Sequence, residues 1–93
     1  MRKIEFTTRF NRDFKREFKG QHGKTLDNNL RAAVALIASG IALPPNMRDH
    51  PLSGSWEDHR DCHLRPDLVL IYRFIGQDVV QFVRLGSHSE LGL

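Results

Sequence analysis

The stretch Leu68–Ile75 is apolar at seven of its eight positions, and Arg73 is the one exception. Its length and its β-branched and aromatic residues are typical of a strand in the middle of a sheet. Gly76–Asp78 then predicts a hairpin turn, after which Val79–Leu85 returns as an antiparallel strand. A β-sheet is therefore the centre of the predicted fold.

A further strand is predicted before the apolar run, at Arg60–Leu64. Successive side chains of a strand point to opposite faces, so Asp61 and His63 share one face and Cys62 and Leu64 share the other. We expect the apolar pair to face the core, which leaves Asp61 and His63 on an exposed face of the sheet. The three strands together make an antiparallel meander.

The N-terminal segment predicts a short strand followed by a helix. Lys3–Thr7 alternates between polar and apolar residues, as a half-buried strand does. From Thr8 the period changes, and Phe10, Phe14 and Phe18 recur at every fourth residue among charged side chains. Such an aromatic face is more typical of core packing than of stacking on nucleic-acid bases.

A second helix is predicted to begin at Thr25 or Asp27 and to end at Gly40, after a short connection at 21–24. Its apolar residues recur at spacings of three and four, at Leu26, Leu30, Ala33, Val34 and Ile37. The short connection predicts that the two helices pack as an antiparallel hairpin. Pro44–Pro45 then predicts an extended, rigid segment.

These elements predict an α+β fold of two layers within a single domain over residues 1–93. Its order is an N-terminal strand, a two-helix antiparallel hairpin and a three-stranded antiparallel meander. We expect the helices to cover one face of the sheet and the other face to remain open as a shallow groove.

Composition excludes several classes of protein. A hydrophobic content of 40% with 27% charged residues argues against disorder. No apolar run approaches the roughly 18 residues of a membrane span, and the N-terminus lacks the apolar core of a signal peptide, so we expect a cytoplasmic protein without a membrane partner. Cys62 is the one cysteine, so neither an internal disulfide nor a cysteine zinc cluster can form.

Titratable side chains are concentrated in the stretch Asp49–Asp67. Its nineteen residues hold three of the five histidines and five of the eleven carboxylates. The predicted strands bring several of these residues together, and the flanking loops bring His50 and His88 to the same region. The resulting candidate site comprises His50, Asp61, His63, Asp67, Arg84 and His88.

Residues of these types suit RNA cleavage without a metal or another cofactor. Histidines take up and release protons at neutral pH, carboxylates orient them, and arginine stabilises phosphate charge. A ribose 2′-hydroxyl can then attack the adjacent phosphate. A metal-dependent enzyme is an alternative, because two histidines and a carboxylate can bind iron or zinc, but the positions match no compact metal-ligand spacing. Arg84 also has a structural interpretation, as the partner of a neighbouring acid.

The first 24 residues carry eight of the fourteen basic side chains and three acidic ones. Clustered lysine and arginine bind phosphate backbones without sequence preference, although a solvated helix face would have the same composition. The candidate RNA-binding residues are Arg12, Lys15, Arg16 and Lys19 on the first predicted helix.

Six short motifs occur in order along the chain: Asp49–Leu52, Gly54–Trp56, Arg60–His63, Pro66–Asp67, Leu70–Tyr72 and Arg84–His88. Together they resemble the YafQ branch of the RelE toxin superfamily, and the likeness in length and element order covers nearly the whole chain. The resemblance implies the toxin of a type II toxin–antitoxin pair. It also implies a ribosome-dependent endoribonuclease that cuts mRNA in the decoding site and so inhibits translation.

The resemblance further implies which residues act and which partners bind. The family's active-site positions correspond to His50, His63, Asp67 and His88, with Asp61 in the same cluster and Arg84 steadying the phosphate. We hypothesise that His50, with Asp67 nearby, is the base and that His88 is the acid, while His63 relays a proton or binds the phosphate.

The implied partners are the ribosome, mRNA and a cognate antitoxin that folds on contact and covers the site. The basic residues of the first helix would then hold ribosomal RNA. A non-catalytic module that only binds an antitoxin or RNA is the alternative.

Overall fold

The predicted meander forms the middle of a five-stranded sheet. The structure is a computed structural model, and it describes residues 1–20 and 23–93. The meander consists of β3 (Arg60–Arg65), β4 (Leu68–Ile75) and β5 (Val79–Gly86), which pair antiparallel. The strand order is β1-β5-β4-β3-β2, so the apolar run forms the central strand, as predicted.

Two short edge strands complete this sheet. β1 (Lys3–Phe6) is the predicted N-terminal strand and pairs parallel with β5. β2 (His50–Pro51) pairs antiparallel with β3 and places His50 opposite Asp61. The sequence did not predict β2, because two residues show no period and Pro51 lacks the amide proton of a regular strand residue. An edge position tolerates this proline, and it brings His50 onto the sheet.

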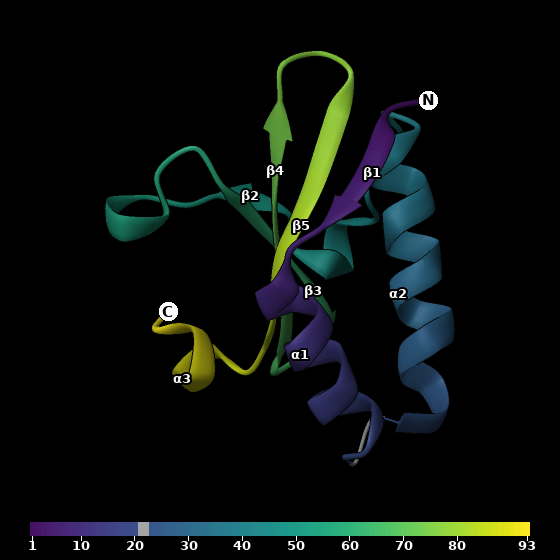
Figure 1. Ribbon diagram of the computed structural model, residues 1–93, viewed down its shortest axis with the longest axis vertical. Helices are drawn as coiled ribbons and strands as arrows, with labels where there is room; N and C mark the ends of the chain where they lie inside the picture. Colours follow the sequence, from purple (N-terminus) through teal and green to yellow (C-terminus); the bar gives the residue numbers. More distant parts are fainter. Residues whose placement is uncertain (21–22) are drawn as a thin grey trace.

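The helices α1 (Thr8–Phe18) and α2 (Gly23–Ala38) form the predicted antiparallel hairpin (Figure 1). The hydroxyl of Thr7 caps α1 by accepting a hydrogen bond from the Phe10 amide at 3.0 Å. The second helix begins at Gly23, inside the connection that the sequence placed at 21–24. The first two positions of that connection lie outside the described residues.

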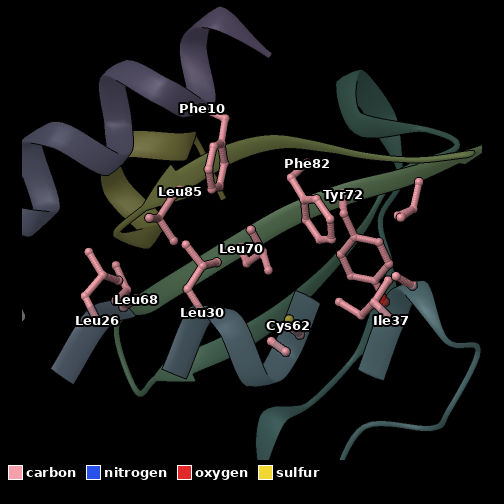
Figure 2. Close-up of a cluster of buried hydrophobic side chains, with 13 residues drawn as sticks. Phe10, Leu26, Leu30, Ile37, Cys62, Leu68, Leu70, Tyr72, Phe82 and Leu85 are labelled. Carbon is pink, nitrogen blue, oxygen red and sulfur yellow. The ribbon is translucent and has the colours of Figure 1, made fainter. Parts of the chain in front are cut away.

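The main core lies between the helix hairpin and one face of the sheet, and Figure 2 shows side chains of both layers meeting there. Four of the five predicted apolar positions of α2 are at most 7% exposed, and Val34 packs against them. The strands contribute the large side chains Tyr72 and Phe82, and Leu70 and Cys62 are fully buried beside them. The prediction that Cys62 faces the core is confirmed.

The aromatic face of α1 is buried only at its N-terminal end. Phe10 is 3% exposed, whereas Phe18 is 51% exposed and contacts Phe14 alone among aromatic rings of the described residues. Four residues exceed one helical turn, so each successive phenylalanine is rotated by about 40° relative to the one before. The prediction that Phe18 packs in the core was therefore wrong.

A second, smaller apolar cluster covers part of the opposite face. It consists of Val69, Ile71 and Leu91, with Leu52, Trp56 and Val83 packed against them. Leu91 belongs to α3 (His88–Leu91), a short helix that the sequence did not predict (Figure 1). The indole Nε1 of Trp56 donates a hydrogen bond to the Leu91 carbonyl at 3.3 Å. This face is therefore not the wholly open groove that the sequence predicted.

The segment after α2 is less extended than predicted. Pro44 is extended, with φ −56° and ψ 145°, but Pro45–Met47 forms one 3-10 turn, η1. Proline suits the first position of a helical turn, because its φ is already set and its missing amide proton is not needed there. A second 3-10 turn, η2, follows β2 at Gly54–Trp56. No described helix has the length and apolarity needed to cross a bilayer.

Candidate active site

The backbone before β2 fixes the orientation of His50. Arg48 has a left-handed conformation, with φ 51°, where the chain leaves η1. The Arg48 carbonyl oxygen lies 2.6 Å from His50 Nδ1. Because a carbonyl only accepts hydrogen bonds, Nδ1 carries the proton of the neutral ring and Nε2 keeps its lone pair. This is the tautomer in which Nε2 can act as a general base.

Asp61 is the buried carboxylate of the site. It is 2% exposed, so the prediction of an exposed face was wrong for this residue. It lies between His50 of β2 and Ile71 of β4, on the face that the second apolar cluster partly covers. Its Oδ1 lies 3.2 Å from His50 Nδ1 but accepts no hydrogen bond from a described residue. Burial raises the pKa of Asp61, and the charges of His50, His63 and His88 oppose that rise.

Asp67 is the partner of His88. The carboxylate oxygen Oδ1 lies 2.7 Å from His88 Nδ1, and it also accepts a hydrogen bond from the His88 amide at 3.1 Å. A capping box between Ser87 and Glu90 fixes the start of α3, where His88 lies. The hypothesis placed Asp67 near His50, but the structure places Asp61 beside His50 and Asp67 beside His88.

One pocket of about 410 Å³ collects these side chains. His63 enters it from β3, and its ring centroid is 5.0 Å from that of His88. The lining residues, which we call the histidine pocket, are His50, Leu52, Ser53, Ser55, Trp56, Asp61, His63, His88, Gly92 and Leu93. The structure thus brings four of the six predicted site residues together, and Asp67 joins them through its bond to His88.

Arg84 does not join the histidine pocket. Its Nε donates to Asp13 Oδ2 at 2.7 Å and its terminal nitrogen to Asp13 Oδ1 at 3.2 Å. The register of β5 shifts between the partners of Ile71 and Tyr72, and such a bulge re-aims the side chains beside it. The alternative interpretation of Arg84, as the partner of a neighbouring acid, describes its contacts.

The four predicted RNA-binding residues are not equivalent. Arg12 and Lys15 are exposed on α1, and Lys19 is exposed at its C-cap, where spacings of three and four residues place the three on one side. Arg16 instead contacts Asp13 at 2.9 Å and Glu90 at 3.2 Å, and it donates to the Leu85 carbonyl at 2.9 Å. Arg16 therefore links α1 to β5 and α3.

Asp49 is a site residue whose contacts the sequence did not reveal. The Tyr72 hydroxyl donates to its carboxylate, and Arg60 donates two further hydrogen bonds at 3.3 and 3.2 Å. Burial, followed by the hydrogen bond to Asp49, raises the pKa of Tyr72. This anchor fixes the residue directly before His50. The register of β3 and β4 could have predicted these contacts, because it pairs Arg60 with Tyr72.

The described residues do not form a site suited to a metal ion. Within residues 1–20 and 23–93, no three His, Cys, Asp or Glu side chains are grouped so that they could hold one. His50 and His88 each use Nδ1 for a hydrogen bond to an oxygen of the protein. In each ring Nε2 is the nitrogen left to face the pocket, where it can accept or donate a proton.

Comparison with known proteins identifies one family by sequence. The family model described as "Bacterial toxin of type II toxin-antitoxin system, YafQ" matches residues 2–92. The mRNA interferase toxin YafQ of Escherichia coli strain K12 is 36% identical over 90 residues, which cover 97% of this chain and 95% of that protein.

Solved structures of similar proteins share the fold. A metal-bound toxin from Helicobacter pylori has a TM-score of 0.87 at 42% identity, covering 98% of this chain and 99% of its own. YafQ in the E. coli DinJ–YafQ toxin–antitoxin complex has a TM-score of 0.82 at 35% identity, with coverage of 97% and 96%. The chain belongs to the YafQ family of bacterial toxins from type II toxin–antitoxin systems.

Proposed function

We propose that this chain is a ribosome-dependent endoribonuclease that cuts mRNA in the decoding site and inhibits translation. The name of the E. coli relative, an mRNA interferase, supports mRNA as the substrate. The observation that carries the proposal is the histidine pocket, which holds two histidines with bonded Nδ1 atoms beside a buried carboxylate. Because the ribose 2′-hydroxyl is the nucleophile, the protein has to supply proton transfer and charge stabilisation.

The reaction divides between two histidine–carboxylate pairs. His50 Nε2 takes the proton of the 2′-hydroxyl, and the nearby Asp61 carboxylate stabilises the imidazolium that forms. The 2′-oxygen bonds to phosphorus, and the bond from phosphorus to the 5′-oxygen breaks. Protonated His88, oriented by Asp67, gives its Nε2 proton to the leaving 5′-oxygen. The products are a 2′,3′-cyclic phosphate and a 5′-hydroxyl.

His63 completes the pocket between these pairs. It lies next to His88, and its ring belongs to the wall that a bound phosphate would contact. We assign it to binding the phosphate or relaying a proton. The proposed steps use side chains of the protein alone.

Partners follow from the same assignment. The exposed side of α1 that carries Arg12, Lys15 and Lys19 would contact ribosomal RNA, as clustered cations do. The E. coli DinJ–YafQ complex supports an antitoxin as the second partner. A segment of that antitoxin would fold on binding and cover the histidine pocket. The toxin would act in the cytoplasm, where ribosomes and mRNA are found.

Cleavage of a defined mRNA on purified ribosomes tests the proposal. Wild type should cut at a fixed codon position only when ribosomes are present. The variants His63→Ala and His88→Ala should each slow cleavage by about 100-fold or more. His59→Ala is the matched control, because His59 lies outside the histidine pocket and should leave the rate unchanged.

Two outcomes would replace the proposal with its alternatives. If folded wild type binds ribosomes without cutting, the chain is a non-catalytic binding module. If EDTA, titrated below the level that disrupts ribosomes, abolishes cleavage, the reaction requires a metal. The metal-bound toxin from H. pylori is the reason to include this arm. Full rates in both histidine variants would refute the assignment of the pocket.

A further inference from the structure

A second hollow adjoins the histidine pocket at His63. It has a volume of about 560 Å³ and lies between α2, η1 and the end of β3. We call it the α2 groove and define it by Asn29, Leu36, Asn46, Met47, Arg48 and Arg65, which line it together with His63. His63 lines both hollows, and β2 pairs only with Arg60 and Asp61, so a strand bound in the histidine pocket could pass around the edge of β3 at His63 and enter the α2 groove.

Three local features create the α2 groove. Ala32 and Ala33 lie in the middle of its helical wall, where small side chains leave space. The register of β3 shifts between His63 and Arg65, and this bulge turns the end of the strand along the groove. On the third side, the left-handed Arg48 joins η1 to β2, so the same short segment shapes the groove and positions His50.

The charge of the α2 groove favours an anion. Its lining contains Arg48, Arg65 and His63, and no carboxylate occurs among the described residues that form it. Neither arginine forms an ion pair with a described carboxylate, and Arg65 donates a hydrogen bond to the neutral hydroxyl of Thr25. Arg84, by contrast, is neutralised by Asp13. Among the described residues, the groove therefore offers two arginines without an ion-pair partner to a phosphate near the histidine pocket.

Polar and apolar side chains of the α2 groove suit a nucleotide base. Leu36 and Met47 offer an apolar surface on which a base can lie. The amides of Asn29 and Asn46 line the same hollow from α2 and η1, and an amide can both donate to and accept from a base edge. Neither amide makes a side-chain hydrogen bond with another described residue.

We propose that the α2 groove binds the mRNA nucleotide next to the scissile phosphate, with Arg48 and Arg65 on its phosphate and Asn29 and Asn46 at its base edge. This inference rests on the proposed function and names the part of the chain that selects the cut sequence. It also assigns to Arg48 and Arg65 the phosphate contact that the sequence suggested for Arg84.

The test is single-turnover cleavage on ribosomes programmed with mRNAs that differ only in the nucleotides flanking the cut. Wild type should prefer one base at one flanking position. Asn29→Ala and Asn46→Ala should each reduce the rate ratio between the best and worst base by at least about fivefold. The neighbouring Asn28→Ala, on an exposed position outside the groove, should keep the wild-type ratio.

The arginines should affect all mRNAs alike. Arg65→Gln and Arg48→Asn should raise the concentration of programmed ribosomes needed for half-maximal cleavage, with little change in base preference. Asparagine is chosen at position 48 because it tolerates the left-handed backbone. Arg31→Gln, which alters an exposed arginine of α2 paired with Asp27, is the control and should behave as wild type.

The outcomes separate the two levels of the proposal. If wild type does not cleave programmed ribosomes, the proposed function and the groove assignment both fail. If wild type cleaves but the groove variants keep its base preference and its half-maximal concentration, the groove assignment alone fails. Unchanged cleavage together with weaker inhibition by the antitoxin would make the groove an antitoxin site and would likewise overturn the nucleotide assignment.

Discussion

Asp61 is an acidic residue that is buried, with only 2% of its surface exposed. Burial raises its pKa above the ordinary value of 3.8, so the folded protein binds this proton more tightly than the unfolded chain. The stabilisation that Asp61 provides is therefore complete below the unfolded pKa and is lost as pH rises through the folded pKa. At neutral pH the ionised carboxylate lowers the free energy of unfolding.

Asp61→Asn should therefore separate stability from activity. We expect a higher melting temperature than wild type at pH 7 and a smaller difference near pH 3, because the amide does not titrate. Cleavage on ribosomes should fall by at least about tenfold, since His50 loses the charge that stabilises its protonated form. Thermal unfolding and cleavage rates measured on the same preparations check both parts. A lower melting temperature with an unchanged rate would make Asp61 a purely structural residue.

Residue pairings could be predicted only where strand register determines them. The alternation of β3 correctly separated Asp61 and His63 from Cys62 and Leu64, and His63 lines the histidine pocket. The partner of Asp67 could not be predicted, because His88 is positioned by α3 rather than by the sheet. The contacts of Arg84 could not be predicted either, because they depend on a bulge in β5, and no pattern in the sequence marks the position of that bulge.

Between elements, Asp13 is the point at which α1, β5 and α3 are joined. Its carboxylate accepts hydrogen bonds from Arg84, Arg16 and the Leu85 amide, and Arg16 continues the link to Glu90 of α3. Burial by itself raises the pKa of Asp13, but these hydrogen bonds outweigh it and hold the pKa below 3.8. The link holds the short helix that carries His88 against the body of the fold.

Asp13→Ala should destabilise the protein by about 2–4 kcal/mol, because Arg84 and the Leu85 amide lose a buried partner. Asp13 has a lowered pKa in the folded state, so its stabilisation is present above the unfolded pKa near 3.8 and is lost as pH falls through the folded value. Urea unfolding at pH 7 and near pH 3 should show a large difference from wild type only at pH 7. Equal stability of the two proteins at pH 7 would contradict the linking role.

The long elements were predictable and the short ones were not. β4 and the apolar face of α2 repeat their periods over enough residues to be recognised, and both occur as predicted. β2 and α3 have two and four residues and depend on contacts distant in sequence, such as Trp56 with Leu91. These short elements carry His50 and His88, which is why the sequence grouped the candidate residues without giving their geometry.

Across the whole molecule, the basic side of α1 and the histidine pocket are separate surfaces with separate expected roles. The triple charge reversal Arg12→Glu, Lys15→Glu and Lys19→Glu should weaken ribosome binding. The negative slope of log affinity against log salt should become shallower by about 2–3. Arg16 is left out because its reversal would break the contacts with Asp13 and Glu90. Sedimentation with ribosomes at several salt concentrations measures both quantities.

Arg31→Glu is the control for that experiment, because Arg31 lies on α2 and is 78% exposed at its side chain. It should reduce ribosome binding by much less than the triple reversal. Equal effects of the two changes would show that total charge, rather than the side of α1, determines binding. Unchanged binding by the triple variant would show that the three residues only form a solvated helix face.

The central claim is that paired histidines transfer protons while a ribose 2′-hydroxyl attacks the adjacent phosphate. The most direct test is to identify the ends of the fragments from one ribosome-bound mRNA. The mechanism predicts a 2′,3′-cyclic phosphate and a 5′-hydroxyl, and no cleavage when the attacking ribose is replaced by 2′-deoxyribose. A 3′-hydroxyl with a 5′-phosphate, or cleavage of the deoxy-substituted mRNA, would contradict it.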